Sequence, residues 1–116
     1  MRFLGWQDYG SALAVAARGR LCVVPSVCEE ACSTTVLEAL ALGKTCIALA
    51  RGGTPELASY QQYPGQLLLA ETMPALVDRV RARLAAPAPP ARPGPPAAFG
   101  ADAAVILPRL VALYAE

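Results

Sequence analysis

The chain has 116 residues, of which 55% are hydrophobic, and a formal net charge of +1. This length fits one small domain, and the composition excludes both intrinsic disorder and long-range electrostatic capture of nucleic acid. The four cysteines form no CxxC pair and histidine is absent, which excludes the usual mixed zinc sites. No run approaches the ~18 apolar residues of a membrane span, and residues 1–10 lack a signal-peptide stretch, so we expect a cytoplasmic protein with reduced thiols.

Short apolar runs alternate with helical patterns along the first 84 residues. We expect, in chain order, a strand at 2–4, a helix at 8–17, a strand at 20–24, a helix from 33 to a stop at 43, a strand at 45–50, a short helix entered through the turn 51–56, a strand at 66–69 and a helix at 73–84. This alternation is typical of βαβ units. It predicts the α/β class, with a Rossmann-like parallel sheet flanked by helices.

Capping residues mark where these helices begin and end. Asp8 and Ser33 are good N-cap types, and Gly43 is suited to stop the second helix. In the glycine turn, Thr54 can cap the short helix and Pro55 suits its first position.

The C-terminal quarter of the chain is different in composition. Residues 87–96 contain six of the eleven prolines, too many for a helix or an inner strand. We therefore divide the chain into a Rossmann-like domain at 1–86, a stiff linker at 87–98 and a C-terminal helix at 99–116, which Pro108 kinks or begins.

The stretch from Pro25 to Glu56 carries the chemistry. Ligands of parallel sheets bind beyond the carboxyl ends of the strands, where helix N-termini point their N–H groups outward. Ser33, Thr34 and Thr35 lie at such a helix start. Their amides and hydroxyls are suited to receive a diphosphate.

Two carboxylates can border the same pocket. Glu30 precedes the helix and Glu38 lies within it on an otherwise apolar segment, so Glu38 needs water, a cation or a hydrogen-bonding ligand beside it. A carboxylate accepts hydrogen bonds well from the vicinal hydroxyls of a ribose or a sugar. Solvent exposure, or a salt bridge from Glu38 to Lys44 or Arg51, is the alternative.

The motif residues resemble those of a known family. Pro25-Ser26, the run EACSTTVLEALALGK from Glu30 to Lys44, and the run GGTPE from Gly52 to Glu56 are similar to the signature region of family-four retaining glycosyltransferases of the GT-B fold. The resemblance covers about residues 2–84. It implies the C-terminal, nucleotide-sugar-binding domain of such an enzyme.

In that family, the residue matching Glu30 faces the donor sugar and the residue matching Glu38 binds the ribose. The turn amides that match Ser33, Thr34 and Thr35 hold the diphosphate of the nucleoside diphosphate sugar. The chain has no Asp-x-Asp pair and no histidine, so neither a metal cofactor nor a histidine base is expected. The departing phosphate itself is proposed to take the acceptor proton.

The remaining motif residues leave alternatives open. Glu56 either touches the site or pairs with a basic neighbour, while Gly52 and Gly53 serve turn geometry more often than ligand approach. The aromatic residues are not assigned to the site; they are Trp6, Tyr9, Tyr60 and Tyr63.

A whole enzyme of this kind has a second, amino-terminal domain that holds the acceptor. That domain and a basic Arg/Lys pair facing the donor phosphates would lie upstream of Met1, so we expect a segment that is inactive alone. An open sheet edge would favour self-association or docking of the missing domain or subunit. The alternative function is a non-catalytic protein-interaction module that keeps the fold. A response-receiver domain fits less well, because its acidic cluster at the first strand is absent.

Overall fold

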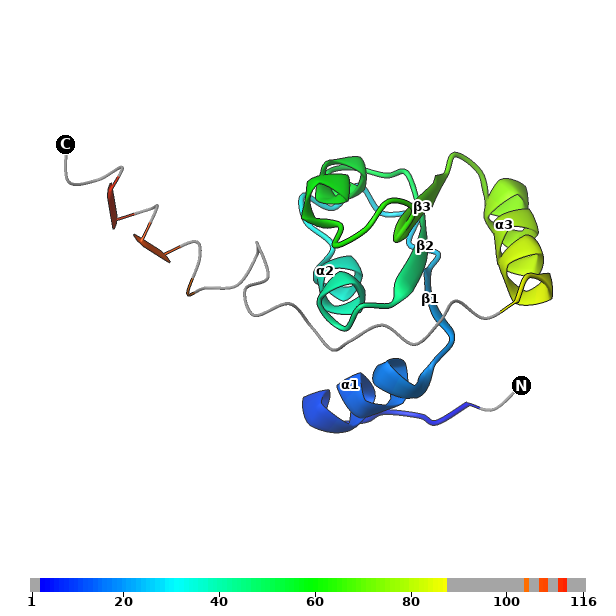
Figure 1. Ribbon diagram of the computed structural model, residues 1–116, viewed down its shortest axis with the longest axis horizontal. Coiled ribbons are helices and arrows are strands. Elements are labelled where there is room, and N and C mark those ends of the chain that lie inside the picture. The colour runs from blue at the N-terminus through cyan, green and yellow to red at the C-terminus, as the bar shows by residue number, and fades with distance from the viewer. Residues whose placement is uncertain (1–2, 88–103, 105–106, 109–110, 113–116) are drawn as a thin grey trace.

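The computed structural model describes residues 3–87, 104, 107–108 and 111–112. In chain order its elements are α1 (Tyr9–Arg18), β1 (Leu21–Val24), α2 (Thr34–Ala41), β2 (Thr45–Leu49), the 3₁₀ helix η1 (Thr54–Tyr60), β3 (Leu67–Ala70) and α3 (Met73–Ala85) (Figure 1).

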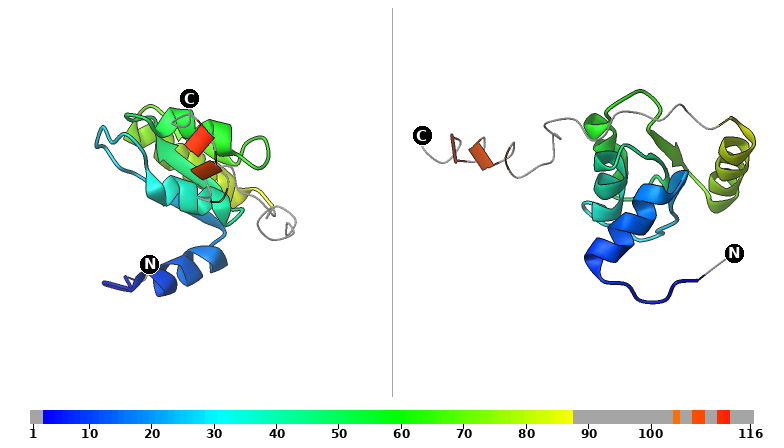
Figure 2. Two further views of the ribbon diagram at one scale, coloured as in Figure 1. Left: turned by 90° about the vertical axis from the view of Figure 1, so that its left-hand side faces the viewer. Right: turned by 60° about the horizontal axis from the view of Figure 1, so that its bottom comes forward.

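The three strands form a parallel sheet in the order β1-β2-β3. Cys22 pairs with Cys46 across the first pair of strands, and Cys46 pairs with Leu67 across the second. Helix α2 and η1 lie on one side of the sheet and α3 lies on the other (Figures 1 and 2). This parallel sheet flanked by helices confirms the predicted α/β, Rossmann-like class.

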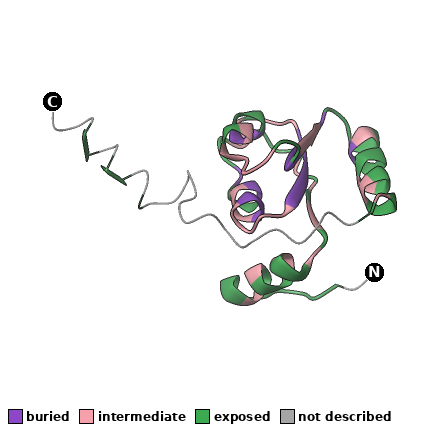
Figure 3. Ribbon diagram, viewed as in Figure 1, coloured by how far each residue is buried: buried purple, intermediate pink, exposed green. Residues whose placement is uncertain are grey.

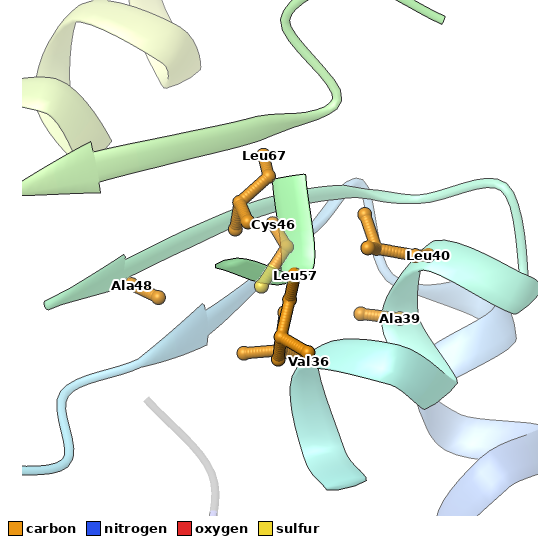
Figure 4. Close-up of a cluster of buried hydrophobic side chains, with 7 residues drawn as sticks. All are labelled: Val36, Ala39, Leu40, Cys46, Ala48, Leu57 and Leu67. Atoms are coloured by element: carbon orange, nitrogen blue, oxygen red, sulfur yellow. The ribbon is translucent and has the colours of Figure 1, made fainter. Parts of the chain in front are cut away.

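Strand β2 forms the centre of the core, because all five of its residues are buried. Its side chains alternate between the two faces of the sheet. Cys46 and Ala48 pack on the α2 side, in a cluster completed by Val36, Ala39, Leu40, Leu57 and Leu67 (Figure 4). Ile47 and Leu49 pack on the α3 side, with Ala70 and Leu76. Each large apolar side chain buried in this way stabilises the fold by about 1.5–3 kcal/mol.

The start of α1 and the end of α2 follow the predicted capping chemistry. The Asp8 carboxylate accepts a hydrogen bond from the Ser11 amide at 3.0 Å. Hydrogen bonding from the Ser11 side chain, and then from its amide, lowers the pKa of Asp8. After α2 the chain turns at Gly43, whose φ of +69° favours glycine. The Arg20 guanidinium donates to the Leu84 carbonyl at 3.0 Å and also to the carbonyl of Ala86, so it satisfies the C-terminal end of α3.

A buried glutamine supports the C-terminal end of α2. The Gln66 side-chain amide donates to the Leu40 carbonyl at 2.8 Å, and its oxygen accepts from the Gln62 amide at 2.7 Å. Both functions of this fully buried amide are therefore satisfied.

Two predicted details are wrong. Phe3 and Leu4 form no strand, since both are exposed and have no strand beside them to share hydrogen bonds; Arg2 lies outside the described residues. The N-cap of η1 is Gly53 rather than Thr54, because the Gly53 carbonyl already accepts from the Glu56 amide at 3.1 Å. Thr54 is instead the buried first residue of that helix, and Pro55 lies in its first turn as predicted.

Helix α1 differs from the other helices in its packing. It contains no buried residue, although it carries several apolar side chains, and it contacts the rest of the fold through α2 (Figure 3). The first turn of α1 nevertheless lies beside α2.

The predicted linker at 87–98 and terminal helix at 99–116 lie largely outside the described residues. In the second segment only residues 104, 107–108 and 111–112 are described, and their backbone is helical. Among the described helices, none combines the length and the hydropathy required to cross a bilayer.

Candidate functional site

The candidate site lies at the edge of the sheet where the strands end. Because β1, β2 and β3 are parallel, the segments that follow them meet at this one edge. These segments are 25–33 after β1, 50–53 after β2 and 71–72 after β3. We call them together the C-terminal rim.

The first two rim segments are in backbone contact. The Gly53 amide donates to the Glu30 carbonyl at 2.9 Å. A Cβ atom at Gly52 would overlap the Glu30 carbonyl oxygen and lie 2.9 Å from the Glu30 nitrogen, and one at Gly53 would overlap the Ala31 carbonyl. With φ at +49°, Gly52 also adopts a conformation that favours glycine. Glycine is therefore required at Gly52 by the turn conformation, and at both positions by the close approach of two backbones.

Side chains complete the links around the rim. The Glu29 carboxylate accepts a hydrogen bond from the Gly52 amide at 2.6 Å. On the other side, the Arg51 guanidinium donates to the Glu71 carbonyl at 3.2 Å. The segments after β1, β2 and β3 are thus tied together through the turn between Arg51 and Gly53. The sequence analysis did not identify Glu29, because nothing distinguishes it from the adjacent Glu30.

Glu30 itself is half-buried in the first rim segment. Its backbone carbonyl is engaged by Gly53, but within residues 3–87 no hydrogen bond or salt bridge engages its carboxylate. Of the two adjacent acids, only Glu29 uses its carboxylate in a hydrogen bond with a described residue.

The first turn of α2 opens on the same rim. Ser33 holds the N-cap position, as predicted, but its side chain makes no capping hydrogen bond. The Leu37 amide is bonded to the Ser33 carbonyl at 3.2 Å, and no described backbone acceptor engages the amides of Thr34 and Thr35. Ser33 is buried and the two threonines are exposed. Unsatisfied donors at a helix start favour an anion.

Glu38 lies further along α2 and is half-buried. Its predicted alternative partners are Lys44 and Arg51, yet the described residues contain one salt bridge only, between Asp78 and Arg81. The Tyr9 phenol of α1 lies instead near the Glu38 carboxylate, and hydrogen-bonding interaction with this carboxylate, followed by its negative charge, raises the pKa of Tyr9. Tyr9 was not assigned to the site, since sequence spacing could not place α1 against α2.

Four of the predicted site residues follow one another along the chain from the rim into the first turn of α2: Glu30, Ser33, Thr34 and Thr35. Glu38 follows in the same helix, and no described contact joins it to Glu30. Strand β1 leads through the rim segment into this helix, as the hypothesis requires. Glu56 is exposed and forms no salt bridge with a described residue, and its role in the site stays a prediction.

The thiols and possible metal ligands complete the description. All four cysteines are free: Cys46 is buried, Cys22 is half-buried, and Cys28 and Cys32 are exposed on the first rim segment. Burial raises the pKa of the Cys46 thiol to about 12. Among the described residues, no group of three or more acidic or thiol side chains is arranged to hold a metal ion.

Comparison with known proteins gives one match. The family model described as glycosyl transferases, group 1, matches residues 1–86, which include every candidate site residue above. No curated protein and no solved structure matches the chain.

Proposed function

Because the chain belongs to the group 1 glycosyl transferases, we propose that its C-terminal rim binds the nucleoside diphosphate sugar donor of a retaining glycosyl transfer. The observation that carries this proposal is the start of α2, which has no side-chain capping hydrogen bond and begins four residues after Glu30, a half-buried carboxylate without a partner among the described residues. Such a helix start attracts a diphosphate, and a carboxylate beside it accepts hydrogen bonds from sugar hydroxyls.

Each residue then has a distinct role. Glu30 faces the donor sugar, and the amides of Ser33, Thr34 and Thr35 hold the diphosphate. Glu38 accepts hydrogen bonds from the ribose hydroxyls, and for this the Tyr9 phenol, which now occupies that carboxylate, has to share it or move away. The exposed position of Tyr9 and the sparse packing of α1 make such a movement inexpensive.

The chemistry proposed here needs no metal. Negative charge develops on the departing diphosphate, and fixed N–H dipoles at a helix start stabilise that charge. The departing phosphate takes the proton of the acceptor hydroxyl on the same face of the sugar, so the chain supplies no separate base. An amino-terminal domain or subunit would hold the acceptor and add basic side chains around the phosphates.

Calorimetric titration with UDP-, GDP- and ADP-sugars tests donor binding directly. Replacement of Glu38 by Gln should weaken binding of the preferred donor about 10- to 100-fold, since hydrogen bonds to a charged acceptor contribute ~1.5–3 kcal/mol. Glu71→Gln is the matched control, because it removes one negative charge from the rim without touching Glu38. If no donor binds even when the amino-terminal domain or subunit that would hold the acceptor (the companion domain) is supplied, the proposed pocket is wrong.

The exposure of α1 favours a second candidate, a protein-interaction module that keeps the fold without turnover. Trp6 is 89% exposed and Val15, on α1, is 45% exposed. Large apolar side chains exposed in one region often mark a protein interface. In this case Glu38→Gln would leave the biological role intact, whereas Trp6→Ser would abolish it.

A further inference from the structure

Glu29 and Glu30 each accept a hydrogen bond that joins two segments of the rim. Glu29 accepts from the Gly52 amide through its side chain at 2.6 Å. Glu30 accepts from the Gly53 amide through its backbone at 2.9 Å. Two consecutive residues after β1 are thus bonded to two consecutive amides after β2. We call this arrangement the rim junction.

The first link of the rim junction is the stronger of the two. A carboxylate that accepts from a backbone amide at this distance makes a charge-assisted hydrogen bond, about twice as strong as a neutral one. No salt bridge competes for Glu29 within the described residues. The absence of side chains at Gly52 and Gly53 permits the approach, since a Cβ at either would overlap the rim backbone.

The rim junction is the main restraint on an otherwise irregular segment. Residues 25–33 form neither helix nor strand between β1 and α2, and many of them are exposed. Without the Glu29 link, the Glu30 backbone is held by one neutral hydrogen bond. A donor would then have to pay the ordering cost of this segment when it binds.

We propose that Glu29 is a positioning residue, which fixes the segment carrying Glu30 and the start of α2 in the geometry that receives the donor. This inference rests on the proposed function and adds a division of roles: Glu29 holds the turn and Glu30 meets the sugar. Glu29 does not touch the ligand. Its effect is transmitted through Gly52 and the adjacent backbone.

The test compares three substitutions of Glu29. Glu29→Gln keeps an oxygen that can accept from Gly52, Glu29→Asp keeps the charge but shortens the side chain by one methylene, and Glu29→Ala removes the acceptor. Glu71→Ala is the matched control, because it removes a negative charge from the same rim while its backbone carbonyl still accepts from Arg51.

Two measurements are made on each full-length variant. Hydrogen exchange of the Gly52 amide, followed by NMR, reports the link itself without any ligand. Calorimetric titration with UDP-glucose, GDP-mannose and ADP-glucose reports donor binding. Far-UV circular dichroism confirms that each variant is folded, and Glu29→Gln provides a folded comparison should Glu29→Ala prove unstable.

We expect Glu29→Ala and Glu29→Asp to accelerate Gly52 exchange at least tenfold and to weaken donor binding about tenfold. Glu29→Gln keeps a neutral acceptor and should fall between Glu29→Ala and the wild type in both measurements, and Glu71→Ala should change neither. Unchanged Gly52 exchange in Glu29→Ala would overturn the link, and accelerated exchange with unchanged affinity would overturn its role in positioning. If the wild-type chain with its companion domain binds none of the three donors, the proposed function fails and the positioning role falls with it.

Discussion

The close approach of the glycine turn to the Glu30 segment predicts a graded response to alanine at three glycines. Gly43 has φ of +69° but nothing within 4 Å of an added Cβ, whereas Gly53 has an ordinary φ of −78° but an obstructed Cβ position. Gly52 has both a positive φ and an obstructed Cβ. The three positions therefore separate backbone strain from steric overlap.

The expected magnitudes follow from these differences. Gly43→Ala should lower the free energy of unfolding by about 1 kcal/mol. The left-handed conformation of alanine costs ~1–2 kcal/mol, and restriction of the unfolded chain offsets ~0.4–1 kcal/mol of this. Gly53→Ala loses about 2–3 kcal/mol, because overlap with a backbone carbonyl costs ~1–3 kcal/mol and the bond to Glu30 is worth ~1 kcal/mol, less the same ~0.4–1 kcal/mol gained by restricting the unfolded chain. Gly52→Ala combines both effects and should lose about 4 kcal/mol or more.

Urea unfolding followed by far-UV circular dichroism measures this series. At an m-value of ~1–2 kcal/mol/M, Gly53→Ala should unfold at a urea concentration about 1–2 M below that of Gly43→Ala. Gly10→Ala in the first turn of α1 is the control for alanine itself and should raise the free energy of unfolding by ~0.4–1 kcal/mol, since its added Cβ would make only an ordinary contact, 3.5 Å from the Asp8 carboxylate. Equal midpoints for Gly53→Ala and Gly43→Ala would refute the close backbone approach at the rim.

Three further predictions use the titratable groups. At pH 8, iodoacetamide should modify the exposed Cys28 and Cys32 and spare Cys46 until urea unfolds the chain, because burial raises the pKa of Cys46 to about 12. Peptide mass spectrometry checks which thiols are modified. Rapid modification of Cys46 in the folded chain would contradict the prediction. Glu38→Gln should lower the pKa of Tyr9 towards 10.0 in an NMR titration. In the wild type, the contact between Tyr9 and Glu38 should persist below pH 10.0 and be lost as the pH rises through the raised pKa of Tyr9. A Tyr9 titration that the substitution leaves unchanged would exclude the contact. Because the pKa of Asp8 is lowered, its cap should stabilise α1 fully above pH 3.8 and be lost as the pH falls through the lowered pKa of the folded chain. The helical circular dichroism signal should decrease over this pH range in the wild type and not in Asp8→Ala.

Most of the fold could be predicted because hydrophobic pattern and capping residues agree over residues 8–85. The apolar residues 46–49 of β2 are covered on both faces of the sheet, on one face by α2 and on the other by α3. Phe3 and Leu4 show where this reasoning fails. A short apolar run is compatible with a strand, but a strand exists only where another strand pairs with it, and pairing is a property of the tertiary structure.

The site was predictable in its location but not in its internal contacts. The order of strand, turn and helix start placed Glu30, Ser33, Thr34 and Thr35 at the rim, since parallel strands end at one edge. Contact between Tyr9 and Glu38 depends on how α1 crosses α2, and neither periodicity nor spacing fixes a crossing between helices that are separated by a strand.

The pair Glu29-Glu30 is the sharpest instance of this limit. The residues are adjacent and chemically identical, and they lie in an irregular segment, where neither the helical nor the strand period assigns a direction to a side chain. What distinguishes them is the Gly-Gly turn 22 residues or more further along the chain, which reaches Glu29 by its Gly52 amide and Glu30 by its Gly53 amide. Two adjacent acids after one strand, and two adjacent glycines after the neighbouring parallel strand, are together the only signal that could have indicated the rim junction. The register of β1 and β2 is what turns that signal into a contact, because it sets how far each segment extends before the two meet.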